Sequence, residues 1–195
     1  MIIRKATAEE MLALWGYPDI DSATPTARFF YKNIEIHNAI FWTAEDDGKL
    51  IGELYVFFDL EDKDFADGQN TAYLCAFRVS MAYRRHGIGT KLVNAALQEL
   101  TENGFSSVTI GVEESEEQNI KLYKRLGILT KIKDCFEDPC AMTEHMNPSP
   151  CSPFWLLQKQ LNLDNGVSPD KVRLVHMTRK LCHELYRFWA KDLER

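Results

Sequence analysis

The sequence has few cysteines, and they form no recognisable pattern. Its five cysteines stand at positions 75, 135, 140, 151 and 182, an odd number at irregular spacing. No Cys-x-x-Cys pair occurs, so the sequence predicts neither a disulfide framework nor a zinc site. The five histidines also lack the spacing that is typical of metal ligands. We therefore expect reduced thiols in a cytoplasmic protein that holds no metal.

Long apolar runs and basic clusters are missing as well. No stretch approaches the ~20 apolar residues of a membrane span, and residues 1–5 lack the apolar core of a secretory signal. The net charge is −6, and no basic cluster is long enough to follow a nucleic-acid backbone. The sequence thus predicts no membrane partner and no nucleic-acid partner.

What is present is the composition of an ordinary globular protein with concentrated negative charge. The 195 residues, of which 45% are hydrophobic, are enough for one well-packed domain. Residues 59–67 hold five acids against one lysine, and residues 113–117 hold four glutamates. Solvated surface is the ordinary interpretation of such runs. Beside a cleft, they would favour a cationic substrate.

Hydrophobic periodicity and turn signals predict a mixed α/β chain. We expect Thr7 to cap the first helix in a capping box with Glu10. Residues 137–153 contain several prolines and no periodicity, so they are expected to form a long loop or lid. For the C-terminal part we expect a helix that begins near Ser168 and ends near Leu193, with a strand at 172–179 as the alternative. The remaining strands are expected at 2–6, 41–44, 50–58, 71–79, 107–112, 128–136 and 154–161, and the remaining helices at 26–38, 90–102 and 117–126.

The stretch from Arg84 to Thr90 is the most informative part of the chain. It lies between the strand predicted at 71–79 and a helix, and the first amides of a helix have no acceptor within the helix. Gly87 and Gly89 would let the backbone approach a ligand closely. Arg84, Arg85 and His86 add positive charge. A pyrophosphate group would suit such a site, although an ordinary strand–helix turn is the alternative.

Two common phosphate-binding motifs fit this stretch poorly. The chain has no Gly-x-x-x-x-Gly-Lys-Ser/Thr, and a dinucleotide fingerprint needs three glycines where only two are present. Arg84-x-x-Gly87-x-Gly89 after Val79 instead resembles the acetyl-coenzyme A signature of the GNAT superfamily of N-acetyltransferases, Arg/Gln-x-x-Gly-x-Gly/Ala. The order of the predicted elements matches that family over roughly residues 2–161.

This resemblance implies a fold and a cofactor site. The fold would be α/β (α+β), with a mixed, mostly antiparallel central sheet flanked by helices in a domain of residues 1–161. Residues 162–195 would be a C-terminal extension, helical and packed on the domain or at a dimer interface. By resemblance, backbone groups of one strand end and one loop would bind acetyl-CoA: Phe77, Arg78, Val79, Arg84, Arg85, His86, Gly87, Ile88, Gly89 and Thr90.

A second match concerns the proton donor. The segment from Leu122 to Ile128 resembles the family's Leu-Tyr-x-x-x-Gly-Phe element, in which the tyrosine protonates the coenzyme A sulfur. The resemblance implies that Tyr123 is the general acid, and a tyrosine hydroxyl is protonated at neutral pH. A tyrosine packed between helix and sheet is the alternative. The chain departs from the family at Glu116 and Asn119, where asparagine and alanine are usual, and we expect Glu116 to point at solvent or substrate.

The general base is less clear. An amine with a pKa near 10 is almost entirely protonated at pH 7, so a carboxylate or a water must take its proton. Glu53 and Glu113 are the candidates, with Glu114 beside the latter, and ordinary surface charge is the alternative for each. An acyl-cysteine route through Cys75 is less favoured, because lone core cysteines are common.

Together these features predict an enzyme that moves an acetyl group from acetyl-CoA directly to a primary amine of a small molecule or peptide. We expect a monomer or a homodimer. A noncatalytic module that binds or senses acyl-CoA is the alternative.

Overall fold

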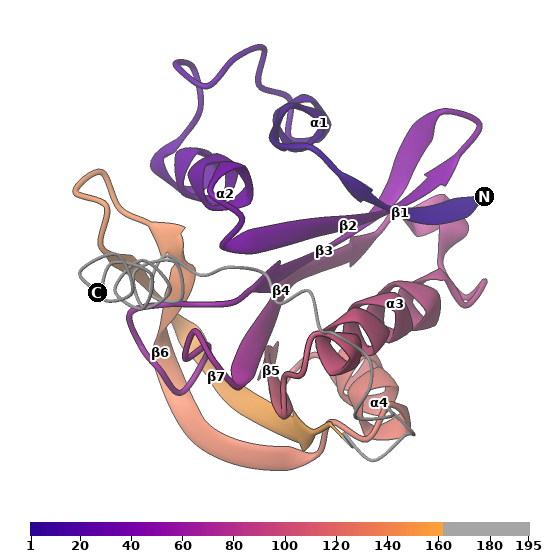
Figure 1. Ribbon diagram of the computed structural model, residues 1–195, viewed down its shortest axis with the longest axis vertical. Coiled ribbons are helices and arrows are strands. Elements are labelled where there is room, and N and C mark those ends of the chain that lie inside the picture. Colours follow the sequence, from indigo (N-terminus) through magenta and orange to yellow (C-terminus); the bar gives the residue numbers. More distant parts are fainter. Residues whose placement is uncertain (162–195) are drawn as a thin grey trace, which may run out of the picture. The chain divides into compact units, whose positions relative to one another are not determined.

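A computed structural model describes residues 1–161 of the protein (Figure 1). The mixed α/β order expected from the sequence is confirmed, whereas the expected C-terminal helix and the extension 162–195 lie outside the described residues. The elements in chain order are β1 (Ile2–Ala6), α1 (Ala8–Leu14), α2 (Pro25–Glu35), β2 (Ala39–Asp46), β3 (Lys49–Phe57), β4 (Thr71–Val79), a 3-10 turn (Met81–Tyr83), α3 (Ile88–Glu102), β5 (Ser107–Glu113), α4 (Glu117–Arg125), β6 (Thr130–Met142) and β7 (Pro148–Gln160).

The seven strands form one sheet in the order β1-β2-β3-β4-β5-β7-β6. Every neighbouring pair is antiparallel except β4 and β5, which are parallel. The expected mostly antiparallel sheet is therefore confirmed. Its single parallel pair lies in the middle, where the chain crosses over through α3.

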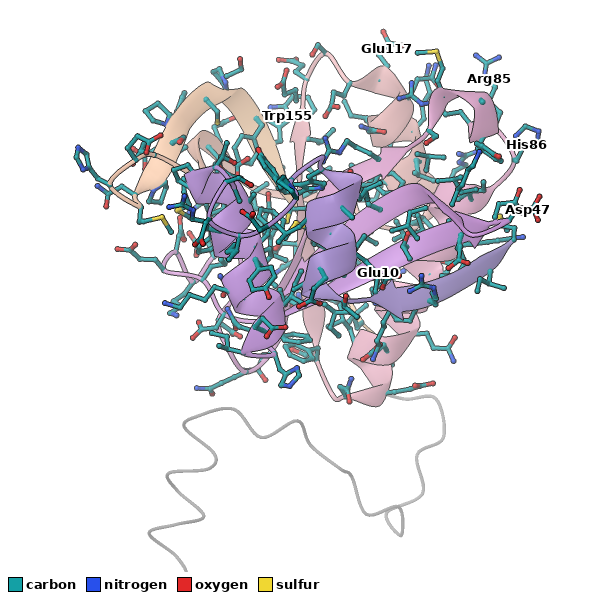
Figure 2. The ribbon with its side chains drawn as sticks, turned by 90° about the horizontal axis from the view of Figure 1, so that it is seen from above. Glu10, Asp47, Arg85, His86, Glu117 and Trp155 are labelled. Carbon is teal, nitrogen blue, oxygen red and sulfur yellow. The ribbon has the colours of Figure 1, made fainter. Side chains whose placement is uncertain are left out.

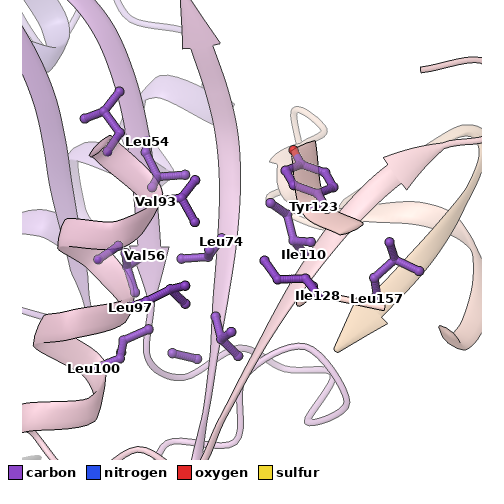
Figure 3. Packing of buried hydrophobic residues seen from close by; sticks show 14 of the residues in the cluster. Leu54, Val56, Leu74, Val93, Leu97, Leu100, Ile110, Tyr123, Ile128 and Leu157 are labelled. Carbon is purple, nitrogen blue, oxygen red and sulfur yellow. The ribbon is translucent and has the colours of Figure 1, made fainter. Parts of the chain in front are cut away.

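Helices cover both faces of the sheet, as Figure 1 shows: α1 and α2 lie on one side, and α3 and α4 on the other. On the α3 side the core is built from aliphatic residues such as Leu92 and Leu100, and it includes Tyr123 (Figure 3). On the α1 side the core is more aromatic, with Phe30 and Tyr55 at its centre. The sheet thus separates two cores of different character.

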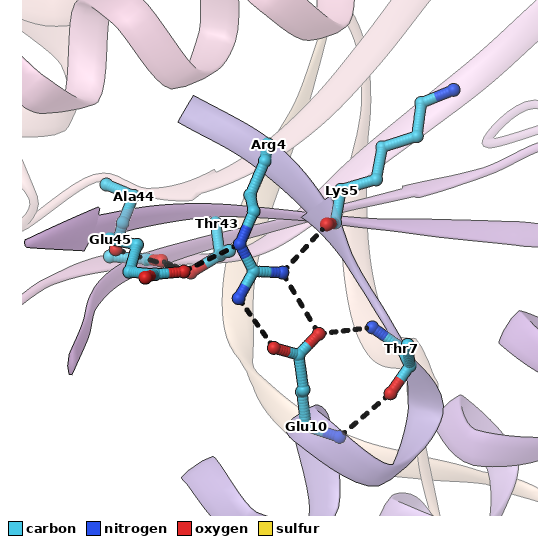
Figure 4. Close-up of polar contacts among 8 residues, drawn as sticks. Arg4, Lys5, Thr7, Glu10, Thr43, Ala44 and Glu45 are labelled. Carbon is cyan, nitrogen blue, oxygen red and sulfur yellow. Dashed lines mark hydrogen bonds and ion pairs between the residues drawn. The ribbon is translucent and has the colours of Figure 1, made fainter. Parts of the chain in front are cut away.

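The capping box predicted at the start of α1 is present, and its glutamate also bonds a neighbouring arginine. Thr7 accepts a hydrogen bond from the Glu10 backbone N–H, and the Glu10 carboxylate accepts one from the Thr7 N–H. The same carboxylate receives two hydrogen bonds from the Arg4 guanidinium, at 2.5 and 3.0 Å (Figure 4). Arg4 also bonds Glu45 at 2.7 Å, so one guanidinium ties β1 to both α1 and β2.

The expectation of a long loop at residues 137–153 is wrong. Strand β6 continues to Met142 and β7 already begins at Pro148, so the segment is the tip of a long hairpin. The prolines of β7 precede Phe154, the first β7 residue that pairs with β5. Their missing N–H groups therefore cost that ladder nothing. Register shifts along β6 and β7 break the alternation that would have revealed the strands.

Candidate active site

The two central strands separate part-way along their length. Strands β4 and β5 pair only from Thr71 with Ser107 to Leu74 with Ile110. Beyond these residues, β4 stays paired with β3 as far as Val79, and β5 stays paired with β7. One backbone edge of each strand is therefore left unpaired where the two diverge.

A β-bulge accompanies this divergence. Between the pairs Glu53–Arg78 and Tyr55–Cys75, β3 advances by two residues and β4 by three, so β4 carries one extra residue. Within the bulge Ala76 has φ = 47°, a left-handed conformation that is strained for any residue with a Cβ. The bulge bends β4 away from its ordinary course at the point where it leaves β5.

A pocket of about 230 Å³ occupies the space between the diverging strands. Its walls come from both cores, since Tyr123 and Ile110 belong to the core on the α3 side whereas Tyr73 and Phe154 belong to the other. The pocket thus reaches both faces of the sheet. It is lined by Tyr73, Leu74, Cys75, Ala76, Phe77, Ile110, Gly111, Val112, Glu113, Glu116, Asn119, Tyr123, Asp138, Cys151, Ser152 and Phe154.

The predicted general acid, Tyr123, lies in this pocket. Its side chain on α4 is buried, with the ring centroid 6.4 Å from that of Phe77. Figure 3 shows its hydroxyl directed away from Ile110 and Ile128. No hydrogen bond to this hydroxyl occurs within residues 1–161. Burial, and secondly the charge of Glu116, raise the pKa of Tyr123 above its ordinary value, so it keeps its proton at neutral pH.

Residues 85–90, here called the amide loop, run into the start of α3. Within the described chain, their backbone N–H groups have no hydrogen-bond acceptor. Helix α3 begins two residues earlier than expected, and Gly87, with φ = 75°, is its N-cap. Gly89 brings the helix against β4, because a Cβ there would lie 2.7 Å from Phe77 Cζ. The amide loop and the pocket are therefore linked through Phe77.

The charged side chains of this loop point outward or bond the loop itself. Arg84 donates through Nε to the Val79 carbonyl oxygen at 3.0 Å, which ties the loop to the end of β4. His86 donates through Nδ1 to the Arg84 carbonyl at 2.8 Å. Arg85 and His86 are exposed and lie at the outer surface of the molecule (Figure 2). Arg84 and His86 thus help to shape the loop, and Arg85 adds positive charge at its rim.

Of the three β4 residues that were predicted to contact acetyl-CoA, only one lines the pocket. Phe77 lines the pocket, whereas Arg78 and Val79 do not. Arg78 instead forms an ion pair with Glu53, 2.5 Å between Nε and Oε1. Val79 is the last residue of β4 and pairs with Gly52.

The two candidate bases have different surroundings. Glu53 is buried, and its carboxylate accepts hydrogen bonds from Trp15 Nε1 at 2.9 Å and the Tyr55 hydroxyl at 3.0 Å, besides the Arg78 ion pair. It does not line the pocket. Glu113 is exposed at the end of β5 and lines the pocket, whereas Glu114 does not. The assignment of a base to either residue stays a prediction.

The two departures from the family pattern occur side by side. Asn119 donates to Glu116 Oε1 at 3.0 Å, and the other Glu116 oxygen accepts from the Glu113 N–H at 3.2 Å. Both residues line the pocket, and Glu116 is exposed. With glutamate at position 116 and asparagine at position 119, this chain has a hydrogen-bonded side-chain pair at the start of α4.

Sequence reasoning missed several pocket residues on the α1 side of the sheet. Asp138, Cys151 and Ser152 come from the hairpin that was expected to be a loop. Tyr73 falls in the strand predicted at 71–79, where nothing in the sequence marks it as a pocket residue. A signal for Asp138 was present, since an acid followed by proline often marks a turn or bend, but nothing in the sequence linked it to the pocket.

The thiols near the pocket are protonated. Cys75 lies 3.8 Å from Cys140, sulfur to sulfur, and burial raises the pKa of both. Burial also raises the pKa of Cys135, to about 11. A raised pKa makes a cysteine a weak nucleophile at neutral pH, which argues against an acyl-cysteine at position 75.

The acidic run 59–67 does not contribute to the pocket. Asp62 and Asp64 both pair with Lys133 on β6, and Asp59 pairs with Lys63. Three of its five acids are therefore neutralised locally. Of the two acidic runs, only 113–117 borders the pocket.

Residues 1–161 show neither a cluster of metal ligands nor a membrane-spanning helix. No group of three or more His, Cys, Asp or Glu side chains in this part of the chain is arranged to hold a metal ion. None of its helices combines the length and the apolar character that are needed to cross a membrane.

Comparison with curated proteins identifies acetyltransferases. N-acetyltransferase family 8 member 3 of Rattus norvegicus is 33% identical over 91 residues, which cover 47% of this chain and 39% of that protein. N-alpha-acetyltransferase 30 of Homo sapiens is 29% identical over 111 residues, which cover 56% of this chain and 29% of that protein. The chain thus spans well under half the length of these two relatives.

Solved structures share the fold. The structure of Arabidopsis thaliana NAA60 in complex with acetyl-CoA matches with a TM-score of 0.59 and 18% identity, covering 82% of this chain and 98% of that one. The model of the acetyltransferase (GNAT) family matches residues 6–128, which is more than half of the chain and includes the amide loop and Tyr123. The protein therefore belongs to the acetyltransferase (GNAT) family.

Proposed function

We propose that this protein is an N-acetyltransferase that moves an acetyl group from acetyl-CoA directly to a primary amine. The observation that carries the proposal is the pocket between β4 and β5, which reaches both faces of the sheet and begins beside the amide loop. A pocket of this form lets a thioester enter from one face and an amine from the other.

The residues present fit acetyl-CoA. Six consecutive N–H groups at residues 85–90 lack acceptors within the described chain, and they stand at the positive end of α3. They would hold the pyrophosphate, with Arg85 adding charge. The unpaired edge of β4 from Cys75 to Val79 would bind the amide groups of the pantetheine arm, as a strand binds a neighbour. Phe77 would lie against the end of that arm.

The reaction needs one proton removed and one supplied. The acceptor nitrogen attacks the thioester carbon, a C–N bond forms and the C–S bond breaks. The nitrogen gives up a proton, and the departing sulfur takes one. Tyr123 is suited to supply it, because it lines the pocket and its raised pKa keeps its hydroxyl protonated. An N–H of the unpaired β4 edge would stabilise the negative charge that develops on the carbonyl oxygen.

For the proton that leaves the amine, Glu113 is better positioned than Glu53. Glu113 lines the pocket, whereas the Glu53 carboxylate already accepts from three donors. A carboxylate whose oxygens are fully engaged is a weak proton acceptor. We therefore assign Glu113 the role of base, directly or through a water molecule.

The acceptor is an amine of a small molecule or a peptide. Relatives named N-alpha-acetyltransferase favour the amino terminus of a peptide. A noncatalytic acyl-CoA sensor, the alternative, would not need a proton donor at the thioester end of the pocket. We place the catalytic domain at residues 1–161 and expect a cytoplasmic monomer or homodimer.

The proposal is tested by following free thiol release from acetyl-CoA with a panel of amines and short peptides. Native protein should turn over at least one acceptor, and Tyr123→Phe should lower kcat about 100-fold with little change in the KM for acetyl-CoA. Tyr31→Phe, on α2 and outside the pocket, is the matched control and should behave like native protein. Tight binding of acetyl-CoA without turnover of any amine would favour the sensor instead.

A further inference from the structure

Within residues 1–161, the charged residues that line the pocket are all acidic. Three carboxylates line it, those of Glu113, Glu116 and Asp138, and none of the lining residues in this part of the chain is a lysine, arginine or histidine. The pantetheine arm of acetyl-CoA is uncharged, so these carboxylates do not oppose its entry. An anionic acceptor would meet repulsion from them.

Asp138 lies on the side of the sheet opposite to the amide loop. It is on β6. Burial, and to a smaller extent the charge of Asp138, raise the pKa of Tyr73, Cys75 and Cys140. Tyr73 and Cys140 belong to the core on the α1 side, whereas α3 and its N-terminus cover the other face. If acetyl-CoA enters along α3, Asp138 faces the acceptor.

The carboxylate of Asp138 is held in place by its own hairpin. Its Oδ1 accepts hydrogen bonds from the N–H groups of Cys140 at 2.8 Å and Ala141 at 3.3 Å. Within residues 1–161, no hydrogen bond or ion pair engages its second oxygen, Oδ2. One oxygen is thus fixed by the backbone, and the other is available to a ligand.

Within residues 1–161, no lysine or arginine forms an ion pair with this carboxylate. Tyr73 and the thiols of Cys75, Cys140 and Cys151 interact with it, and burial raises the pKa of all four, so they are neutral at pH 7. Both lysines on the same strand are already paired, Lys131 with Asp134 and Lys133 with Asp62 and Asp64. Among the described residues, the Asp138 carboxylate in the pocket wall therefore has no lysine or arginine as a counter-ion.

From this arrangement we propose that Asp138 is a specificity-determining residue, which selects acceptors that carry a second cationic group beside the amine that is acetylated. The inference rests on the proposed function. Asp138 would accept a charge-assisted hydrogen bond from that cation, while Glu113 and Glu116, which line the same pocket, add to the attraction. An ammonium or a guanidinium group would serve equally, whether on a small molecule or on the second residue of a peptide.

The test compares acceptors that differ in this one charge. Agmatine is paired with pentylamine, and the peptide Ala-Arg-Ala-Ala with Ala-Gln-Ala-Ala, because a guanidinium group is not itself acetylated. We expect native protein to favour the cationic member by about 10- to 100-fold in kcat/KM. If the preference is larger between the two amines, the cation belongs to a small molecule; if it is larger between the two peptides, the cation belongs to a peptide.

Asp138→Asn keeps an oxygen for the Cys140 and Ala141 N–H groups and removes the charge. It should abolish most of the preference without changing the KM for acetyl-CoA. Glu137→Gln, its exposed neighbour outside the pocket, is the matched control and should keep the preference. In native protein, without any substitution, 0.5 M NaCl should also reduce the preference by screening.

Equal kcat/KM for both members of each pair would overturn the proposal, and so would an Asp138→Asn variant that slows both members alike. Failure of catalysis itself is recognised separately. If no acceptor is turned over, calorimetric binding of agmatine to the CoA-saturated native protein and to Asp138→Asn still tests the site. Agmatine that binds both proteins equally, or neither, would refute it.

Discussion

Gly89, at the start of α3, packs directly against Phe77 on β4. A Cβ at position 89 would lie 2.7 Å from Phe77 Cζ, closer than any ordinary contact. Phe77 also lines the pocket and lies beside Tyr123. This one contact thus couples the start of α3 to the floor of the proposed thioester site.

The coupling predicts a compensating pair of substitutions. Gly89→Ala should push the Phe77 ring into the pocket and weaken acetyl-CoA binding about tenfold, as expected for overpacking by one methyl group. In a Phe77→Leu background, which removes the ring, the same substitution should cost much less. A double-mutant cycle on acetyl-CoA affinity measures this. Strictly additive effects would show that the two residues are not coupled.

The arginines of the loop should differ in their contribution to cofactor binding. Arg85→Ala removes charge alone, whereas Arg84→Ala also releases the Val79 carbonyl. We expect both to raise the KM for acetyl-CoA by about 3- to 10-fold with kcat nearly unchanged, and Arg84→Ala to have the larger effect.

Two comparisons separate charge from loop shape in that experiment. Arg84→Lys keeps the charge but loses the Nε donor, so it should remain impaired, and 0.5 M NaCl should narrow the gap between native protein and Arg85→Ala. Lys32→Ala on α2 controls for general loss of positive charge. An effect confined to kcat would contradict an anchoring role for either arginine.

The Arg4–Glu10 contact predicts a dependence of stability on pH. The hydrogen bonds from Arg4 hold the pKa of Glu10 below its ordinary value of 4.5. Ionised Glu10 therefore stabilises the fold above the unfolded-state pKa, and this contribution is lost as pH falls through the lower folded-state value. Glu10→Gln keeps a capping-box acceptor but loses the charge.

Urea unfolding at two pH values measures this contribution. At pH 7, Glu10→Gln should lower the free energy of unfolding by about 0.5–1 kcal/mol, a range reduced for partial exposure of the pair. At pH 3 the difference from native protein should shrink towards zero. Glu35→Gln, at the end of α2, serves as the control. A deficit of equal size at both pH values would mean that the charge of Glu10 contributes nothing.

Much of the fold could be predicted because its signals are local. The Thr7–Glu10 capping box, the strand at 71–79 and the glycine loop each depend on a few neighbouring residues. Strands at 128–136 and 154–161 could be predicted, but the tip of the β6–β7 hairpin could not, because its register shifts break the alternation and its prolines are typical of a loop.

The residues of the candidate site also fall into two groups, those that local motifs predict and those that only the folded sheet brings together. Tyr123 and the amide loop follow from short motifs, whereas Asp138 and Tyr73 join the pocket only because β6, β7 and β4 come together in the sheet. For Glu53 the sequence shows an acid on a strand. That Trp15, Tyr55 and Arg78 surround it depends on three separate elements.

Direct transfer predicts that Cys75 is dispensable. Burial raises the pKa of its thiol, so it should not be acetylated at neutral pH. Cys75→Ala should keep most of the native kcat. Native protein incubated with acetyl-CoA and no acceptor should show no acetyl group at Cys75 by mass spectrometry after digestion. An acetylated Cys75 that is discharged when an amine is added would establish a ping-pong route instead.

The proposed cofactor site requires that the backbone amides of residues 85–90 hold the pyrophosphate. Titration calorimetry of native protein with acetyl-CoA and with S-acetylpantetheine, which lacks the pyrophosphate and nucleotide, tests this directly. We expect acetyl-CoA to bind at least about 100-fold more tightly than S-acetylpantetheine, a difference of about 2.7 kcal/mol in binding free energy. Equal affinity for the two thioesters, or no heat with either, would contradict it.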